Sequence, residues 1–279
     1  MRYAIKTAPQ HTTWTDMLDV WREADRIELF ESAWNFDHFY PINTDDSSGP
    51  CLEAWVTLAA LAQATQRIRI GTMVNGVIYR HPAVLANMAA SLDIISGGRL
   101  ELGLGAGWNL AECDAYGIEL GSLTERFDRF DEAVAVIISL LANETTDHDG
   151  EHYRLRAARC EPKPVQQPHP PICIGGRGPR RTLPLVARRA QHWNFPGRDA
   201  DDLIATRGLL EEQCHLIGRD PSDITVSQHI FVDPEPDLAA ITHQADQLEA
   251  AGLDLAIIYL PTPHRAADVE RIATALDNR

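Results

Sequence analysis

Short apolar runs alternate along the chain with longer segments in which apolar residues recur every three or four positions. The short runs are typical of buried strands, and the longer period is typical of helices with one apolar face. Strands are predicted at residues 3–6, 28–34, 68–74, 99–105, 171–175, 192–195, 224–232 and 255–260. Because helical patterns separate these strands, the chain is predicted to form a parallel sheet covered by helices.

The helices are predicted from their caps as well as from their period. Thr13 can cap a helix with apolar residues at positions 14, 17, 18 and 21, and Pro82 can stand in the first turn of another. Ser122 and Glu125 form a capping box before a third helix. Further helices are predicted at 52–65, 203–217, 238–251 and 266–276, with glycines at 218 and 252 where C-caps belong. Pro184 must lie in the first turn of the helix after the fifth strand, or it would kink that helix.

The repeated strand–helix alternation favours an α/β fold, a single TIM barrel of the (β/α)8 type formed by one domain over residues 1–279. A doubly wound open sheet fits the same pattern and is the alternative. Two stretches depart from the repeat: a polar loop at 35–49 and a proline-rich segment at 143–170, which is predicted as an insertion between the fourth and fifth strands. Residues 151–155 are predicted to form an extra strand there, because long loops without secondary structure are rare in compact domains.

Composition excludes several classes of function. The net charge of −15 argues against binding to nucleic acids or anionic membranes, whose phosphates it would repel. The five cysteines are scattered and form no CxxC pair, which indicates free thiols in a reducing compartment. No apolar run resembles a signal peptide or a membrane helix, so a cytoplasmic location is expected. The histidines form no HxH or HExxH motif, so no metal site is expected.

Two candidate segments follow the second and fourth predicted strands, at the end where a barrel places its active site. Asp37 and His38 follow the second strand, and a histidine that titrates near neutral pH suits acid–base catalysis. A loop histidine that caps backbone groups is the alternative. The fourth strand ends in Gly103, Gly105 and Gly107. The missing side chains would either let a ligand lie against the backbone or relieve crowding in the barrel.

A third candidate segment, made of Gly175, Gly176, Arg177 and Gly178, follows the fifth strand, with further arginines at 180 and 181. Consecutive glycines between a strand and a helix expose N–H groups to an anion, and arginines add charge-assisted donors. The pattern favours a phosphate site over a flexible turn with solvated arginines.

Together these segments resemble the luciferase-like flavin and deazaflavin oxidoreductases over nearly the whole chain. The resemblance is most specific at 71–74, 79–86, 92–99 and 105–108 with Glu112, and a second block covers 174–176 and 190–194. It implies a cofactor across the barrel mouth, with a non-proline cis peptide between Met73 and Val74 behind the ring system. The turn at Gly105, Ala106 and Gly107 would then line the ring, and Gly175, Gly176, Arg177 and Gly178 would bind the phosphate.

Within that family, Asp37-His38 and the glycine turn that ends in Trp108 look like the branch that uses coenzyme F420, so F420 is favoured over FMN. In that branch the aspartate contacts the ring system, and the histidine is proposed to sit near the reacting substrate. Trp108 stands where the sugar-phosphate dehydrogenases of the branch carry a glutamate, and Glu112 lies farther on. A tryptophan offers an apolar wall but no proton transfer, which argues against a sugar phosphate as substrate.

The expected function is therefore hydride transfer between F420 and a small organic substrate. His38 is the expected proton donor or acceptor, and Asp37 would orient either the ring or His38. Trp34, Trp108 and Glu112 are expected with His38 in the substrate pocket. The alternatives are an FMN-dependent monooxygenase that uses reduced flavin and oxygen, and a flavin-binding or deazaflavin-binding protein without catalytic activity. The resemblance also implies a homodimer.

Overall fold

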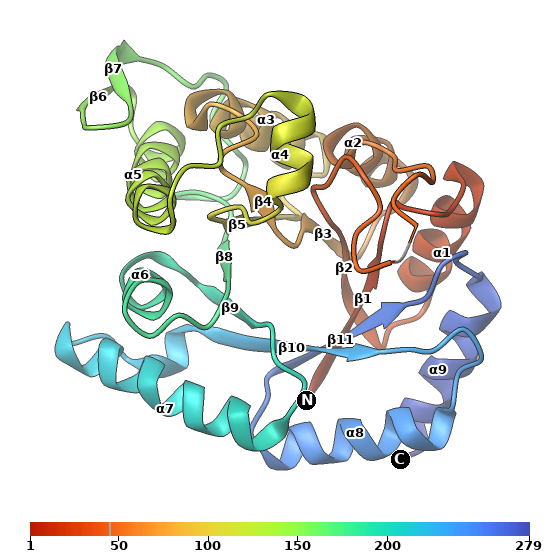
Figure 1. Ribbon diagram of the computed structural model, residues 1–279. Helices are drawn as coiled ribbons and strands as arrows, with labels where there is room; N and C mark the ends of the chain where they lie inside the picture. The colour runs from red at the N-terminus through yellow and green to blue at the C-terminus, as the bar shows by residue number, and fades with distance from the viewer. Residues whose placement is uncertain (45) are drawn as a thin grey trace.

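A closed barrel of eight parallel strands forms the centre of the computed structural model, which describes residues 1–44 and 46–279 (Figure 1). The barrel strands are β1 (Arg2–Thr7), β2 (Phe30–Asn35), β3 (Arg69–Thr72), β5 (Leu100–Gly105), β8 (Ile172–Gly175), β9 (His192–Phe195), β10 (Thr225–Phe231) and β11 (Leu255–Leu260). Neighbouring strands pair in order around the ring, and pairing of β3 with β5 closes it. The predicted barrel is therefore confirmed, and the open-sheet alternative is wrong because neither edge is left unpaired.

The third predicted strand is interrupted where the resemblance placed a cis peptide. Strand β3 ends at Thr72, the peptide between Met73 and Val74 is cis, and a two-residue strand, β4 (Asn75–Gly76), then resumes pairing with β5. Glycines on β5 make room for this irregular stretch. A Cβ on Gly103 would lie 2.0 Å from the carbonyl oxygen of Thr72, and one on Gly105 would lie 2.6 Å from Val74. The packing interpretation of these two glycines is confirmed.

Helices surround the barrel as the period predicts: α1 (Trp14–Arg26), α2 (Ala54–Ala64), α3 (Pro82–Ile95), α5 (Leu123–Ala142), α6 (Thr182–Arg189), α7 (Ala200–Leu216), α8 (Leu238–Ala250) and α9 (Ala266–Asp277). A short 3-10 helix, η1 (Pro221–Asp223), precedes β10. Thr13 and Ser122 form the capping boxes of α1 and α5, and Gly218 and Gly252 follow α7 and α8 with positive φ. Pro184 is the third residue of α6 and lies in its first turn, as predicted.

The insertion between β5 and β8 contains a two-stranded antiparallel hairpin, β6 (Thr146–Asp149) and β7 (Arg154–Ala158), which projects from the barrel beyond α5 (Figure 1). The extra strand predicted at 151–155 is displaced toward the C-terminus. The hairpin turn occupies the residues before Arg154, because the N–H of Gly150 donates to the carbonyl of Tyr153 at 3.0 Å.

One helix was missed by the sequence pattern. Helix α4 (Leu110–Tyr116) follows β5, begins behind the cap residue Asn109 and ends at Gly117 with φ +67°. Seven residues are too few to show a helical period, so only the caps could have indicated it. The helix matters because it carries Glu112. No helix in the described part of the chain has the length and apolarity needed to span a membrane.

Candidate active site

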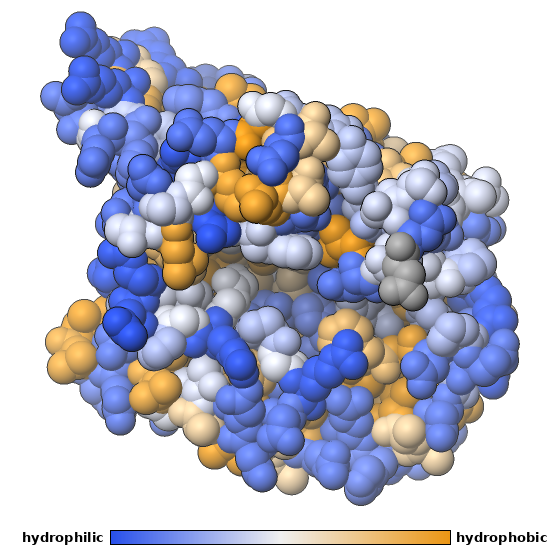
Figure 2. Space-filling model, in the orientation of Figure 1, coloured by the Kyte–Doolittle hydropathy of each residue, from blue (hydrophilic) through white to orange (hydrophobic). Residues whose placement is uncertain are grey.

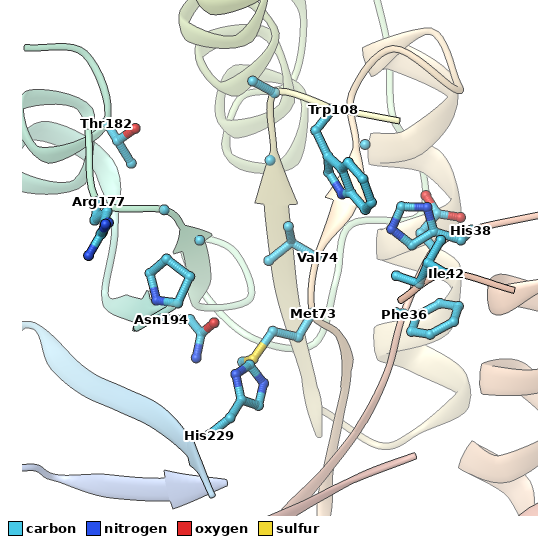
Figure 3. A pocket seen from close by; sticks show the side chains of 18 of the residues that line it. Phe36, His38, Ile42, Met73, Val74, Trp108, Arg177, Thr182, Asn194 and His229 are labelled. Atoms are coloured by element: carbon cyan, nitrogen blue, oxygen red, sulfur yellow. The ribbon is translucent and has the colours of Figure 1, made fainter. Parts of the chain in front are cut away.

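A cavity of about 530 Å³ opens at the carboxyl ends of the barrel strands, in the hollowed centre of the face that Figure 2 shows. It brings together nearly all the residues that the three candidate segments predicted. In Figure 3, His38 and Trp108 lie on one side of the cavity, Arg177 and Thr182 lie on the other, and Val74 stands between them. The predicted residues that line it are Asp37, His38, Met73, Val74, Gly105, Ala106, Gly107, Trp108, Gly175, Gly176, Arg177 and Gly178.

His38 is held in one orientation by a buried carboxylate. Its Nδ1 lies 2.8 Å from Oε2 of Glu112, and both side chains are almost fully buried. An ionised carboxylate only accepts hydrogen bonds, so Nδ1 carries the hydrogen and Nε2 is the second ring nitrogen, left without a partner in the described part of the chain. Phe36 and Trp108 pack edge-on against the imidazole, with ring centres 5.2 Å and 5.4 Å away.

Glu112 accepts hydrogen bonds from two segments, the loop after β2 and the stretch after β4. Besides His38, it accepts from the hydroxyl of Tyr79 at 2.7 Å and from the backbone N–H groups of Phe39 and Tyr40. Burial alone would raise the pKa of Glu112, but the hydrogen bonds from His38, Tyr79 and Phe39 hold it below its usual value. Glu112 does not line the cavity, so its predicted place in the pocket wall is wrong. It lies behind His38 and fixes the loop that carries it.

Asp37 lines the cavity beside His38 but has a different partner. Its Oδ2 accepts from Arg80 at 2.7 Å, and Arg80 also reaches Glu53 at 2.5 Å. Burial raises the pKa of Asp37, although the Arg80 guanidinium opposes that shift. Its Oδ1 is buried and has no hydrogen-bond partner in the described part of the chain. Of the two predicted roles for Asp37, orientation of His38 is therefore wrong, because Glu112 holds that ring.

Of the two tryptophans predicted as pocket walls, one lines the cavity and the other does not. Trp108 lines the cavity, with 56% of its surface exposed. Trp34 is fully buried inside the barrel and does not line the cavity, so that prediction is wrong. Its indole N–H donates to Ser32 at 3.0 Å, and its ring lies over Gly71, where a Cβ would be only 2.4 Å away. Trp34 is the fifth of the six residues of β2, and its ring packs in a buried cluster inside the barrel with Ala4, Cys173 and Ile257.

The glycine turn after β8 forms the opposite side of the cavity. Gly176 has φ +122°, a conformation that side chains rarely adopt, and Thr182 at the start of α6 also lines this side. Arg177 reaches the cavity and forms an ion pair with Asp202. Arg181 does not reach it, because its guanidinium pairs with an aspartate on α5. The turn therefore offers bare backbone and one arginine.

Sequence reasoning missed a lysine in the floor of the cavity, on the side of β1, β10 and β11. Lys6, His229 and Tyr259 line this part, with Nζ of Lys6 lying 3.4 Å from Nε2 of His229. A signal was present, since Lys6 is one of two lysines in the chain and stands at the carboxyl end of the first predicted strand.

A buried ion-pair cluster lies deeper in the barrel. Glu101 contacts Arg69 at 2.6 Å and His192 at 3.1 Å. Burial alone would lower the pKa of His192, but Cys173 and Glu101 raise it to about 10. Burial alone would raise the pKa of Glu101, but His192 and Arg69 hold it at about 2. Within residues 1–44 and 46–279, no group of three or more histidine, cysteine or acidic side chains could hold a metal ion.

The closed barrel, the cis peptide on its third strand and the cavity above them define a known class. The chain belongs to the luciferase-like monooxygenase family, which it matches over residues 1–278. It is similar to the F420-dependent hydroxymycolic acid dehydrogenase of Mycobacterium tuberculosis, with 33% identity over 229 residues that cover 81% of this chain and 61% of that protein. It is also similar to the F420-dependent glucose-6-phosphate dehydrogenase of Microbacterium testaceum, with 30% identity over 240 residues that cover 85% of this chain and 69% of that protein.

Solved structures show the same fold at lower identity. An F420-dependent secondary alcohol dehydrogenase in complex with an F420-acetone adduct has a TM-score of 0.87 at 21% identity, covering 99% of this chain and 98% of the other. A monooxygenase from Streptomyces bottropensis has a TM-score of 0.80 at 20% identity, covering 99% and 97%. The predicted family resemblance and the predicted barrel are both confirmed.

Proposed function

We propose that this protein is an oxidoreductase that binds coenzyme F420 across the barrel mouth and transfers a hydride between it and a small organic substrate. The observation that carries the proposal is a single cavity with the His38–Glu112 pair on one side and a glycine turn suited to phosphate on the other. The two relatives named as F420-dependent enzymes support the deazaflavin as the cofactor.

The cavity residues fit a flat ring system with a phosphate tail. Gly107 has φ +82° and a Cβ there would lie 2.5 Å from Ile78, so the turn beside the cavity presents bare backbone. Gly176 has the same effect on the opposite side. Asp37 lines the cavity, and its buried Oδ1, which has no partner among the described residues, fits a ligand that donates a hydrogen bond. Arg177 and the N–H groups of its turn would hold the phosphate.

When bound, F420 would supply the carbon that donates or accepts the hydride. His38 would give a proton to the substrate oxygen, or take one from it, through Nε2, because Glu112 occupies Nδ1. Trp108 and Phe36 would keep the imidazole in place and exclude water from this side of the cavity. Glu112 would stabilise the imidazolium that forms when His38 takes a proton.

The test is turnover of F420 by a matched pair of histidine variants. Secondary alcohols and aldehydes are screened with F420 and its reduced form, following the change in deazaflavin fluorescence. His38→Asn should lower kcat by about 10²–10⁴-fold without loss of F420 binding, since only proton transfer is removed. The exposed His243 on α8 gives the control variant, His243→Asn, which should match the wild type. Unchanged turnover in His38→Asn would refute the role of His38. If the protein consumes oxygen with reduced FMN and shows no turnover of F420, the monooxygenase alternative would be favoured.

A further inference from the structure

The floor of the cavity contains a lysine among aromatic side chains, and we define the Lys6 compartment as Lys6, His229, Phe231 and Tyr259. Lys6 pairs with Tyr259 across β1 and β11, and Tyr259 pairs with Phe231 across β11 and β10. Residues in register on neighbouring strands point to the same side of a sheet, so these three form one row that faces the cavity. The ammonium of Lys6 lies 4.7 Å from the centre of the Tyr259 ring.

Lys6 is buried without a countercharge. Only 7% of its surface is exposed, and no carboxylate in the described part of the chain forms an ion pair with it. Among residues 1–44 and 46–279, the hydrogen-bonding contact of its ammonium is with His229, at 3.4 Å. Burial and the neighbouring Lys6 lower the pKa of His229 well below its usual value, so this imidazole is neutral and offers no negative charge. An unpaired buried ammonium is costly, and burial lowers the pKa of Lys6 to about 7.

Three other cationic side chains show the contrast with Lys6, because each has hydrogen-bonding or ion-pair partners within the protein. Lys163, the second of the two lysines, donates to three backbone carbonyls at 2.6–3.0 Å. Arg177 on the far side of the cavity pairs with Asp202, and Arg80 pairs with two carboxylates. Of the lysine and arginine side chains that line the described cavity, Lys6 is the one without a carboxylate partner in the described part of the chain.

We propose that the Lys6 compartment binds the anionic group of the substrate, and that this group is a carboxylate attached to a flat, apolar body. The proposal deepens the proposed function and rests on it for the reaction. One buried ammonium balances one negative charge, which favours a carboxylate over a phosphate dianion that needs several donors. Phe231 and Tyr259, with ring centres 5.2 Å apart, supply the apolar wall beside it.

The entrance of the Lys6 compartment also combines a cation with an aromatic ring. Phe231 is 38% exposed, and the guanidinium of Arg198 lies 4.0 Å from the centre of its ring. A cation at the entrance attracts an anion toward the floor, and the aromatic rings between the two cations match a planar ligand. An oxo acid, a hydroxy acid or an unsaturated acid would place its carboxylate here while its reacting carbon lies nearer His38.

The chain's two lysines make a direct test possible by NMR. Protein labelled with ¹³C at lysine Cε gives two side-chain signals, and Lys163 serves as the internal control. At pH 8 the Lys6 amine is largely neutral, and the other titratable groups around it are His229, Tyr259 and Cys173. Benzoate should shift the Lys6 signal toward its position at pH 5 and leave the Lys163 signal in place. Benzamide, its uncharged isostere, should bind at least about 10-fold more weakly, because it lacks the charge-assisted hydrogen bond.

A variant separates this proposal from the proposed function. Lys6→Met should weaken benzoate binding by about 10-fold or more while F420 binds as it does to the wild type. Benzoate that binds Lys6→Met as tightly as the wild type, or benzamide that binds as tightly as benzoate, would overturn the proposal. Absence of F420 binding in both proteins with benzoate binding intact would instead count against the proposed function. If Lys6→Met does not fold, the benzoate-induced shift of the Lys6 signal in the wild type decides alone.

Discussion

Glu112 gives the sharpest prediction about how the site is held together. The buried carboxylate accepts from four donors: the imidazole of His38, the hydroxyl of Tyr79 and two backbone N–H groups. In Glu112→Gln the side chain keeps its shape, but one oxygen becomes an NH₂ group that faces donors instead of accepting from them. Two donors then lose their acceptor, and each buried donor left without an acceptor destabilises the fold by roughly 1–3 kcal/mol. Rotation of the tyrosine hydroxyl recovers part of this, so the free energy of unfolding should fall by about 3 kcal/mol.

The assay for Glu112→Gln is urea unfolding at pH 7, followed by tryptophan fluorescence and compared with Glu144→Gln. Glu144 is exposed and has no hydrogen-bond partner in the described part of the chain, so its variant should stay within about 0.5 kcal/mol of the wild type. Nitrogen NMR of His38 provides a second reading, because the wild type should hold the hydrogen on Nδ1 and the variant should populate both tautomers. A Glu112→Gln protein with the stability and the tautomer of the wild type would refute the account of this carboxylate.

Three further predictions concern the barrel interior. Lys6→Met should raise the free energy of unfolding by about 2 kcal/mol at pH 7 in a urea titration, because it removes an unpaired buried charge; a loss of stability would contradict this. Glu101→Gln should lower it by about 3 kcal/mol. The raised pKa of His192 means that its pairing with Glu101 stabilises the fold fully below about pH 6.5 and that this stabilisation is lost as the pH rises through about 10. The difference in free energy of unfolding between Glu101→Gln and the wild type should therefore be largest near pH 5.5 and smaller by about pH 10. A difference that is constant with pH would contradict this. Gly103→Ala should destabilise by about 3 kcal/mol, whereas Gly208→Ala in the open middle of α7 should stabilise by about 0.7 kcal/mol; equal effects would contradict the packing at Gly103.

Local periodicity predicted the fold well because each strand and helix carries its own signal. The strands appeared within about two residues of their predicted bounds, since apolar runs and caps depend on short stretches of sequence. The extra strand of the insertion was misplaced, because its hairpin turn at Gly150 depends on which residues pair across it. Helix α4 was missed because seven residues cannot display a period.

The candidate site was likewise predicted only in part. Residues within a few positions of a strand's carboxyl end, such as His38 and Gly176, were predicted because a barrel brings strand ends together. Glu112 was predicted as a pocket residue, but its contact with His38 was not, and neither was the role of Tyr79. These residues lie 74 and 41 positions from His38, and no local pattern joins them. Trp34 was misassigned because its position relative to the cavity depends on how far β2 extends before the loop begins.

The central claim is that the cavity binds a deazaflavin, and the most direct measurement is a titration of the purified protein with F420 and, separately, with FMN, following ligand fluorescence. The account predicts tight binding of F420, much weaker binding of FMN, and a loss of about 10-fold or more in F420 affinity in Arg177→Met but not in the neighbouring Arg180→Met. Tight binding of FMN with weak binding of F420, or binding of neither, would contradict it.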